Sequence, residues 1–292
     1  MTESAVEPKQ GVAIVANDKI SEWLLPFLES YRASNAATEL YLIPYDDDVE
    51  LTRRAADVYG ATWVDDDMRQ LDDLAKRLYP LSPYRRRRLR KLQSLALPLD
   101  RVIYIDVDTL LFRDVRPLFE RLTPGETEFI VASTSDDYVY NDKQSQVDFL
   151  KGVLLFSDGF WLTSRHVLGI RDFQDVVEAE EKLFHAVRKR GGLYAQPLVN
   201  FVVHRRGLRV RSLSECMPGA SDESFYKVTT ARFAEDGPVD LHGSAIYFMH
   251  WAGAVQLPKD RYFDGAWLDY AKAAAERMSA ASSIKVWRAG LS

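Results

Sequence analysis

Two aspartates that directly follow an apolar run are the residues of this chain best suited to chemistry. Val102 to Ile105 is a β-branched and aromatic run, which predicts a buried strand, and Asp106-Val107-Asp108 follows it at once. In an extended backbone residues i and i+2 point to the same face, so both carboxylates lie side by side where the strand reaches the surface. Two close carboxylates repel each other and favour a cation. Hard divalent ions such as Mg²⁺ or Mn²⁺ accept oxygen ligands of this kind, together with substrate phosphates.

Two other interpretations of these acids remain open from the residues alone. The simplest is a solvated acidic turn at the end of a strand, which the apolar run before the acids makes less favourable. The second is the D-x-D-x-T motif of the haloacid dehalogenase phosphatases, which Thr109 would complete. In those enzymes the motif usually lies near the start of the chain, and a later G-D-x-x-x-D follows. Here the motif begins at Asp106 and no such later motif occurs.

The whole stretch from Leu99 to Val115 closely resembles the DxD segment of the GT-A glycosyltransferases, in the form R-V-x-Y-x-D-x-D-x-L found in the glycogenin and lipopolysaccharide galactosyltransferase type. The resemblance implies an α/β fold of the GT-A kind, which is a Rossmann-like nucleotide-diphospho-sugar transferase with a mixed, mostly parallel central sheet flanked by helices. It also implies that Asp106 and Asp108 hold Mn²⁺ or Mg²⁺, and that Asp106 and Val107 contact a UDP- or GDP-sugar.

A second segment of the same family occurs near the end of the chain. Ala245 to Met249 reads as a late strand, and the sequence His250-Trp251-Ala252-Gly253 that follows resembles the family's H-x-x-G-x-x-K-P motif. The resemblance implies that His250 completes the metal site and that Gly253 lies at the donor. The family's lysine is absent at 256, where Gln stands, so Lys259 is the candidate phosphate contact. A lone histidine after an apolar run is otherwise more often structural.

The elements that must position these residues follow a strand-helix-strand-helix-strand pattern at the start of the chain. Apolar runs predict strands at 11–16, 39–44 and 61–64, with helices at about 21–31 and 49–59 between them. This is the opening of a doubly wound parallel sheet, whose ligands lie beyond the carboxyl ends of the strands. Asn17, Asp18 and Asp46 fall at those ends. The resemblance implies that such positions hold the base and ribose, and a turn or helix-capping role is the alternative.

A basic helix is predicted just before the acidic motif. At 100° per residue Leu89, Leu92 and Leu95 share one face with Arg85 and Arg88, and Lys91 lies on its flank. A cation on a core-facing side needs an anion, which the acidic motif or a diphosphate can supply. In the resembled family a basic residue on this helix contacts the donor, and Arg88 and Lys91 are the nearest matches. The acid-rich stretch 65–73 is an equal candidate to neutralise part of this run.

Two further segments resemble donor-binding parts of the family. The run from Phe149 to Phe156 reads as a strand, and Gly152 in it matches the glycine of an F-N-x-G-V segment that lets the sugar approach the backbone; Leu150 replaces the family's Asn. The segment Ala195-Gln196-Pro197-Leu198-Val199-Asn200 resembles D/E-Q-x-x-L-N, with Ala195 in place of the acid. The resemblance therefore implies Gln196 as the candidate catalytic and donor-sugar contact, and it provides no carboxylate nucleophile.

Composition bounds the remaining possibilities. The chain has 292 residues with a net charge of -5, which makes a general attraction to nucleic acid unfavourable. Cys216 is the single cysteine, so no disulfide within the chain is expected. The sequence contains no signal-peptide core and no run of about 18 apolar residues. A cytoplasmic location is therefore the simplest expectation. The tail 284–288 is short, basic and amphipathic, which is compatible with weak contact with a membrane surface. A tail of this kind more often packs locally or is disordered.

These observations together predict a glycosyltransferase. We expect a flexible N-terminus at 1–10, a GT-A catalytic domain at 11–265, and a C-terminal helix and tail at 266–292. The expected reaction moves a sugar from a UDP- or GDP-sugar to a hydroxyl of a sugar, glycan or small-molecule acceptor, with retention of configuration and with Mn²⁺ or Mg²⁺ as cofactor. The alternatives are a phosphatase that uses D-x-D-x-T and a non-catalytic module that binds nucleotide sugars.

Overall fold

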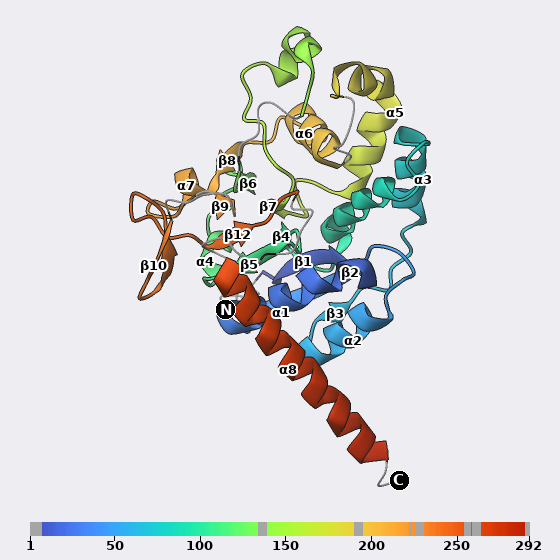
Figure 1. Ribbon diagram of the computed structural model, residues 1–292. Coiled ribbons are helices and arrows are strands. Elements are labelled where there is room, and N and C mark those ends of the chain that lie inside the picture. The colour runs from blue at the N-terminus through green and yellow to red at the C-terminus, as the bar shows by residue number, and fades with distance from the viewer. Residues whose placement is uncertain are drawn as a thin grey trace, which may run out of the picture.

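A seven-stranded mixed sheet forms the centre of the molecule, with the strand order β3-β2-β1-β4-β7-β6-β8 (Figure 1). The computed structural model describes residues 8–133, 139–189, 195–221, 224–225, 231–253, 258 and 264–289, and for 224–225 and 283–289 it describes the backbone alone. The strands of this sheet are β1 (Gln10–Ala16), β2 (Glu39–Pro44), β3 (Thr62–Trp63), β4 (Arg101–Ile105), β6 (Phe129–Val131), β7 (Phe160–Ser164) and β8 (Val210–Ser212).

The pairing directions agree with the predicted α/β class. β1 pairs in parallel with β2 and β4, β2 pairs in parallel with β3, and β6 pairs in parallel with β8. β7 is the exception, because it runs antiparallel to both β4 and β6. The prediction of a mixed, mostly parallel central sheet flanked by helices is therefore confirmed.

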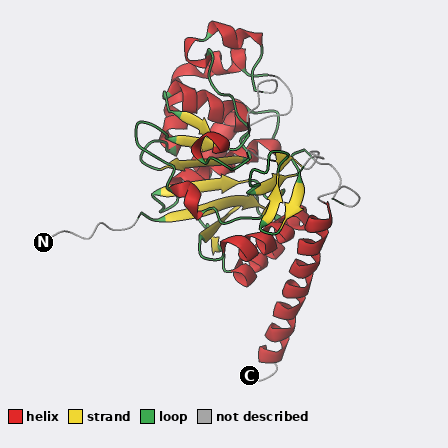
Figure 2. Ribbon diagram, turned by 90° about the vertical axis from the view of Figure 1, so that its left-hand side faces the viewer, coloured by secondary structure: helices red, strands yellow, loops and turns green. Residues whose placement is uncertain are grey.

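Helices cover both faces of this sheet, as Figure 2 shows. Alternate residues of β1 separate to opposite faces, as the period of two requires: Ala13 and Val15 enter one core cluster, and Val12 and Ile14 enter the other. The first cluster includes residues of α3, η2, α5 and α6, and the second includes residues of α1, α2 and α4 together with Met278 of α8. The α-helices are α1 (Ser21–Asn35), α2 (Glu50–Tyr59), α3 (Arg69–Leu78), α4 (Arg116–Phe119), α5 (Ile170–Val187), α6 (Ala195–Arg205), α7 (Leu213–Cys216) and α8 (Asp264–Ala289). The 3₁₀ helices are η1 (Asp18–Ile20), η2 (Arg85–Ala96), η3 (Asp142–Gln146) and η4 (Asp148–Leu150).

A small second sheet lies at the edge where β4 ends. It has the order β5-β12-β9, from β5 (Thr109–Leu111), β12 (Phe248–His250) and β9 (Ser224–Phe225), and a separate hairpin joins β10 (Arg232–Ala234) to β11 (Gly237–Val239). β5 begins one residue after Asp108 and pairs antiparallel with β12. This small sheet brings the end of the chain back to the acidic motif.

The predicted strand from Phe149 to Phe156 is wrong. Residues 148–150 form the 3₁₀ turn η4, and the strand of this region is β7, Phe160–Ser164. Residues 149–156 and 160–164 are both apolar, but only 160–164 lies between two other strands. It pairs with β4 on one side and with β6 on the other. Apolar composition alone does not separate a strand from a buried loop.

The basic helix before the acidic motif exists, but its geometry is not the predicted one. η2 is a 3₁₀ helix, in which residues three apart lie above one another. Leu89, Leu92 and Leu95 therefore form one buried ridge, and Arg88 stays exposed instead of sharing the apolar face. Lys91, three residues after Arg88 in the same helix, is nevertheless only 6% exposed. The position of Arg85 and Arg88 on the apolar face is thus corrected.

The long helix α8 packs along α1 and then extends away from the rest of the protein (Figures 1 and 2). It is attached by a group that we call the α8 clasp, which consists of Glu29, Arg32, Tyr59 and Arg277. The buried carboxylate of Glu29 accepts hydrogen bonds from Arg277 at 2.7 and 3.2 Å, from Tyr59 at 2.9 Å, and from Arg32. Although burial would raise it, these partners lower the pKa of Glu29 to about 2.

No helix in the part of the chain that the structure describes combines the length and apolar character needed to cross a membrane.

Candidate metal centre

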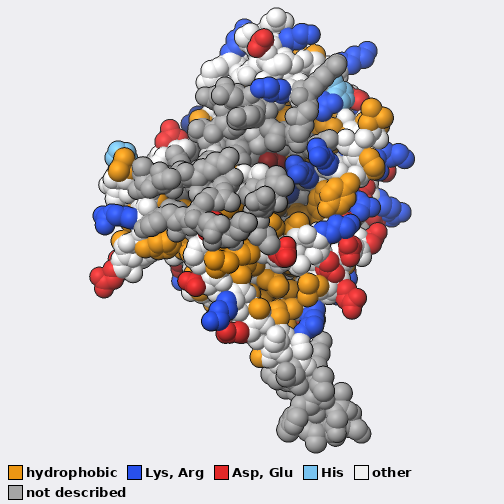
Figure 3. All heavy atoms as spheres, in the orientation of Figure 1, with side chains coloured by type: hydrophobic (Ala, Val, Ile, Leu, Met, Phe, Trp, Pro, Cys, Tyr) orange, Lys and Arg blue, Asp and Glu red, His pale blue; other side chains and the backbone are white. Residues whose placement is uncertain are grey.

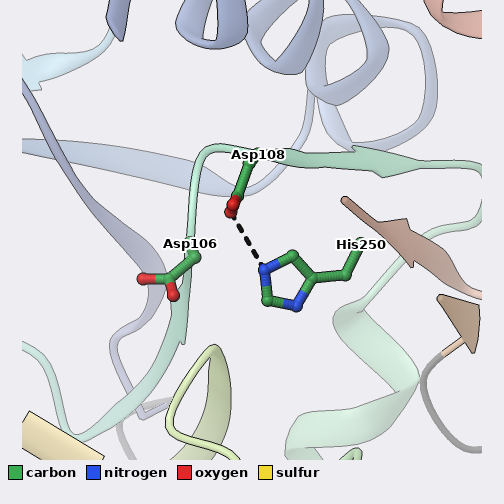
Figure 4. A group of neighbouring side chains, drawn as sticks. All are labelled: Asp106, Asp108 and His250. Atoms are coloured by element: carbon green, nitrogen blue, oxygen red, sulfur yellow. Dashed lines mark hydrogen bonds and ion pairs between the residues drawn. The ribbon is translucent and has the colours of Figure 1, made fainter. Parts of the chain in front are cut away.

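Asp106, Asp108 and His250 converge where β4, β5 and β12 meet (Figure 4). One possible ligand atom from each side chain lies within 4.8 Å of the other two. The register explains this: His250 pairs with Thr109, the residue after Asp108, so the imidazole lies beside that carboxylate. His250 Nε2 is 2.9 Å from Asp108 Oδ1. The structure thus brings together the three residues predicted as metal ligands, although 142 positions separate Asp108 from His250.

Backbone hydrogen bonds fix the two aspartates. The N–H of Asp106 donates to the carbonyl of Gly159 at 2.8 Å, and the N–H of Trp251 donates to the carbonyl of Asp108 at 2.8 Å. The Trp251 indole donates in turn to Asp264 at 3.2 Å, which ties the His250 strand to the first residue of α8. Burial would raise the pKa of Asp108, but the adjacent His250 lowers it below its usual range. Asp108 is therefore held as a carboxylate.

Gly159 closes one side of this group. A Cβ atom at this position would lie 2.6 Å from Cε1 and 3.1 Å from Nδ1 of His250, and 3.4 Å from Asp106 Oδ2. The first distance is shorter than any van der Waals contact, so any side chain at 159 would displace the imidazole. The backbone dihedral φ of Gly159 is not positive, so glycine is required here for space and not for conformation.

Lys91 reaches the acids from η2. Its ammonium donates to Asp106 Oδ1 at 3.2 Å and to the carbonyl of Asp158 at 3.0 Å, and it lies 2.9 Å from Asp158 Oδ2. The ring of Tyr104 lies 4.8 Å away, and the Tyr104 hydroxyl donates to Asp106 Oδ1 at 2.5 Å. The buried amine is therefore surrounded by acceptors and an aromatic face, as a desolvated charge requires.

Asp106, Asp108, Asp158, Lys91 and His250 form what we call the acid-rich cluster. Burial alone would lower the pKa of Lys91, but Asp106 and Asp158 raise it above its usual range. Burial raises the pKa of Asp158, Lys91 opposes this, and the charge of Asp106 adds to it. The pKa of Lys91 is thus raised by its carboxylate partners, whereas the pKa of Asp158 is raised mainly by burial.

The sequence-based prediction missed Asp158 and Gly159. They precede β7, which pairs antiparallel with β4, and Phe160 lies opposite Ile105. The start of β7 therefore meets the end of β4, and residues 158–159 reach Asp106. In the sequence, Ser157-Asp158-Gly159 is a turn-like segment before the apolar run of β7. Its place beside Asp106 could not be predicted without knowing that β7 pairs with β4.

The structure places Asn17, Asp18 and Asp46 beyond the ends of β1 and β2, at the predicted edge. Asn17 Nδ2 donates to Asp46 Oδ2 at 2.9 Å, and both side chains are buried. Asp18 accepts from the Leu51 and Thr52 N–H groups at 3.0 and 2.7 Å and from the Thr52 hydroxyl. These bonds overcome the effect of burial and lower the pKa of Asp18. Asp18 thus caps α2, as the alternative interpretation proposed.

Of the other donor-side predictions, Arg88 lies on the exposed side of η2, and its charge acts on Asp158. Figure 3 shows Lys and Arg side chains gathered on this face of the molecule. Part of the basic run is neutralised by the acid-rich stretch, since Arg90 binds Asp72 at 2.6 Å. Gly152 does not contact the acid-rich cluster: a Cβ there would meet no atom within 4 Å. The glycine at the acids is Gly159, because β7 and not 149–156 is the strand.

The remaining predicted residues lie on α6 and after β12. Gln196 is buried in the first turn of α6, and Asn200 of the same helix binds both the N–H and the carbonyl of Phe156, at 3.0 and 2.8 Å. This pair of bonds fixes the segment that leads to Asp158. Gly253 follows His250 with a φ of 67°, which favours glycine. Lys259 lies outside the described residues.

Two carboxylates and an imidazole form a donor set that fits a divalent ion. Mixed oxygen and nitrogen ligands suit Mn²⁺ better than Mg²⁺. Three protein ligands leave further coordination positions for water or for phosphate oxygens. The centre can therefore hold a cation that binds an anionic substrate group.

Comparison with solved structures identifies the fold. A galactosyltransferase, LgtC, in complex with donor and acceptor sugar analogs superposes with a TM-score of 0.58 at 15% identity, over 90% of this chain and 95% of that one. A bifunctional glycosyltransferase, WbbM, gives 0.56 at 13% identity over 94% of this chain and 52% of its own. The glycosyltransferase GlyE of Streptococcus pneumoniae gives 0.54 at 16% identity, over 95% and 65%. The chain therefore has the GT-A glycosyltransferase fold.

Comparisons at the level of sequence add nothing to this result. No protein-family model matches the chain, and no curated protein matches it. The fold is shared with these glycosyltransferases at identities of 13–16%.

Proposed function

We propose that this protein is a metal-dependent glycosyltransferase that moves a sugar from a UDP- or GDP-sugar to a hydroxyl group of a sugar, glycan or small-molecule acceptor. The observation that carries the proposal is the convergence of Asp106, Asp108 and His250 within 4.8 Å at the carboxyl edge of a GT-A sheet. LgtC, which shares this fold, is described in complex with donor and acceptor sugar analogs. The fold favours a transferase over the phosphatase alternative.

In the proposed reaction Asp106, Asp108 and His250 hold Mn²⁺ or Mg²⁺ against the donor diphosphate. The ion supplies charge neutralisation for the departing nucleoside diphosphate. Arg88, on the exposed side of η2, and Lys259 are proposed to add positive charge on the phosphate side. Asn17 and Asp46 are proposed to border the nucleoside, and Val107 and Gly253 to contact the donor through their backbone.

The sugar is proposed to lie between the metal centre and α6, where Gln196 is the candidate to contact it. We propose retention of configuration, on the basis of the resemblance of residues 250–253 to the retaining families. Ala195 provides no carboxylate at the first position of α6, so no nucleophile is assigned there.

The first test is a thermal-shift screen with UDP and GDP, each with and without Mn²⁺. A nucleotide at 100 times its Kd stabilises the fold by about 2.7 kcal/mol, which corresponds to a shift of several degrees in Tm. We expect such a shift with one of the two nucleotides, larger with Mn²⁺ than without, and the shift should disappear in Asp108→Asn.

The second test measures release of the nucleoside diphosphate from UDP- and GDP-sugars, with acceptor mixtures present. Metal-dependent release supports the transferase, whereas nucleotide binding without any release would favour the non-catalytic module. Hydrolysis of a generic aryl phosphate together with no response to nucleotides would overturn the proposal in favour of a phosphatase.

A further inference from the structure

The acid-rich cluster contains one carboxylate and one ammonium more than a metal site of two aspartates and one histidine requires by itself. Among the described residues the cluster contains three carboxylates, from Asp106, Asp108 and Asp158, and one ammonium, from Lys91. With a neutral imidazole, as metal ligation requires, these side chains sum to a charge of -2. This charge is equal and opposite to that of a divalent ion.

Lys91 connects the third acid to the metal ligands. Its ammonium lies 3.2 Å from Asp106 Oδ1 and 2.9 Å from Asp158 Oδ2, and the Lys91 side chain is only 7% exposed. Two fixed acceptors on Asp158, the carboxylate and the backbone carbonyl, hold the amine. Because Lys91 and the Tyr104 hydroxyl both bind Oδ1 of Asp106, Oδ2 is the oxygen that lies toward Gly159 and His250.

We propose that Asp158, acting through Lys91, is a positioning residue that sets the net charge and therefore the ion selectivity of the Asp106–Asp108–His250 site. This inference rests on the proposed metal-dependent function. Asp158 restrains the ammonium and offsets its charge, so that Lys91 orients Asp106 without neutralising the site. Arg88 also acts on Asp158 through space, but it is exposed and solvent screens its charge.

The test compares the binding of Mn²⁺ and Tb³⁺, without nucleotide, to the full chain and to three variants. Asp158→Asn changes the cluster charge to -1, Lys91→Met changes it to -3, and the double variant Lys91→Met/Asp158→Asn restores -2. Mn²⁺ binding is followed by the resonance of free Mn²⁺ and Tb³⁺ binding by its luminescence. The ratio of the two affinities is the decisive quantity, because general damage to the site weakens both ions.

We expect the preference for Tb³⁺ over Mn²⁺ to rise roughly tenfold or more in Lys91→Met and to fall roughly tenfold in Asp158→Asn, since each unit of nearby charge acts more strongly on the trivalent ion. The double variant should return to within about threefold of the wild-type ratio. Asp72→Asn is the matched control, because it removes a carboxylate paired with Arg90 of the same helix η2 without touching the cluster, and it should change nothing.

An unchanged ratio in Lys91→Met and in Asp158→Asn, with Mn²⁺ still bound by the wild type, overturns this inference alone. If the wild type binds neither ion, the proposed metal site fails as well. If Asp158→Asn does not fold, the comparison of Lys91→Met with the double variant decides the question. The proposal is supported if the ratio of Tb³⁺ to Mn²⁺ affinity rises in Lys91→Met and returns to the wild-type value in the double variant. It is overturned if the two variants have the same ratio.

Discussion

The acid-rich cluster and the α8 clasp each contain a buried charged side chain, Lys91 in the first and Glu29 in the second, but the positive and negative charges around these two residues are balanced differently. In the clasp one carboxylate, Glu29, faces two guanidinium groups and a phenol, and its pKa is lowered to about 2. In the acid-rich cluster three carboxylates share one ammonium, and the pKa of Asp158 is raised. A satisfied cluster stabilises a fold, whereas an excess of one sign is a cost that a ligand of opposite charge can relieve.

The two clusters also differ in what surrounds them. The clasp lies between α1, α2 and α8, where it joins helices that are distant in sequence. The acid-rich cluster lies at the meeting of strand ends, and Gly159 leaves it room. The same chemistry of carboxylates and cations therefore serves attachment in one region and ligand binding in the other. The following predictions separate these two roles.

The largest expected effect is on activity, from Asp108→Asn. This change keeps the size of the side chain but removes a proposed metal ligand and the partner of His250, so the rate of sugar transfer should fall roughly 10³-fold, about 4 kcal/mol. Steady-state release of nucleoside diphosphate measures it. The Tm without metal should stay close to that of the wild type, and a variant that remains active would contradict the proposed site.

The clasp should show the opposite behaviour. Glu29→Gln removes the buried carboxylate that accepts hydrogen bonds from Arg32 and Arg277, whose side chains are partly exposed, so the free energy of unfolding should fall by about 2 kcal/mol. Urea unfolding measures this loss, and the affinity for Mn²⁺ should be that of the wild type. If Glu29→Gln lost as much Mn²⁺ affinity as Asp108→Asn, the α8 clasp and the acid-rich cluster would not be independent.

Gly159→Ala should damage the site without a large loss of stability. The added methyl would overlap the His250 ring, so metal affinity should fall by about 10- to 100-fold, as it does when a group that orients a metal ligand is removed. Titration with Mn²⁺ measures it. Gly265→Ala is the matched control, because its Cβ meets no atom within 4 Å and its φ is not positive. Equal affinities in both variants would rule out this steric role.

The smallest expected effect is on the acid side of the stability profile. The pKa of Glu29 is about 2 in the folded protein, against 4.5 for an unperturbed glutamate, so its contribution is complete above pH 4.5 and is lost as the pH falls toward 2. At pH 3.5 about 1 kcal/mol of it should be gone. The difference in free energy of unfolding between the wild type and Glu29→Gln isolates the contribution of the Glu29 charge. This difference should decrease by about 1 kcal/mol between about pH 6 and pH 3.5. A constant difference would show that Glu29 does not titrate in this range.

The sequence by itself determined the fold class and the three proposed metal ligands. The alternation of short apolar runs and helical patterns predicted the opening of a doubly wound parallel sheet, because burial imposes a pattern that remains visible in the residues. The mixed sheet with an antiparallel strand was implied only by the resemblance to the GT-A glycosyltransferases. Asp106 and Asp108 were recognisable because they lie in one local segment. His250 was recognisable only through a resemblance in the motif, and the register of β12 against β5 explains why it lies there.

Only the tertiary structure decided the rest of the site. Asp158 and Gly159 reach Asp106 because β7 runs antiparallel beside β4, and a choice of strand partner depends on the whole sheet rather than on a local pattern. Lys91 is buried against Asp106 and Asp158, whereas Arg88, three residues earlier in the same 3₁₀ helix, is exposed. The difference depends on what packs against each turn of η2, which no helical period applied to the sequence can give. Charge balance within a buried cluster depends on distances of about 3 Å between side chains that are far apart in sequence, and a linear pattern does not contain those distances.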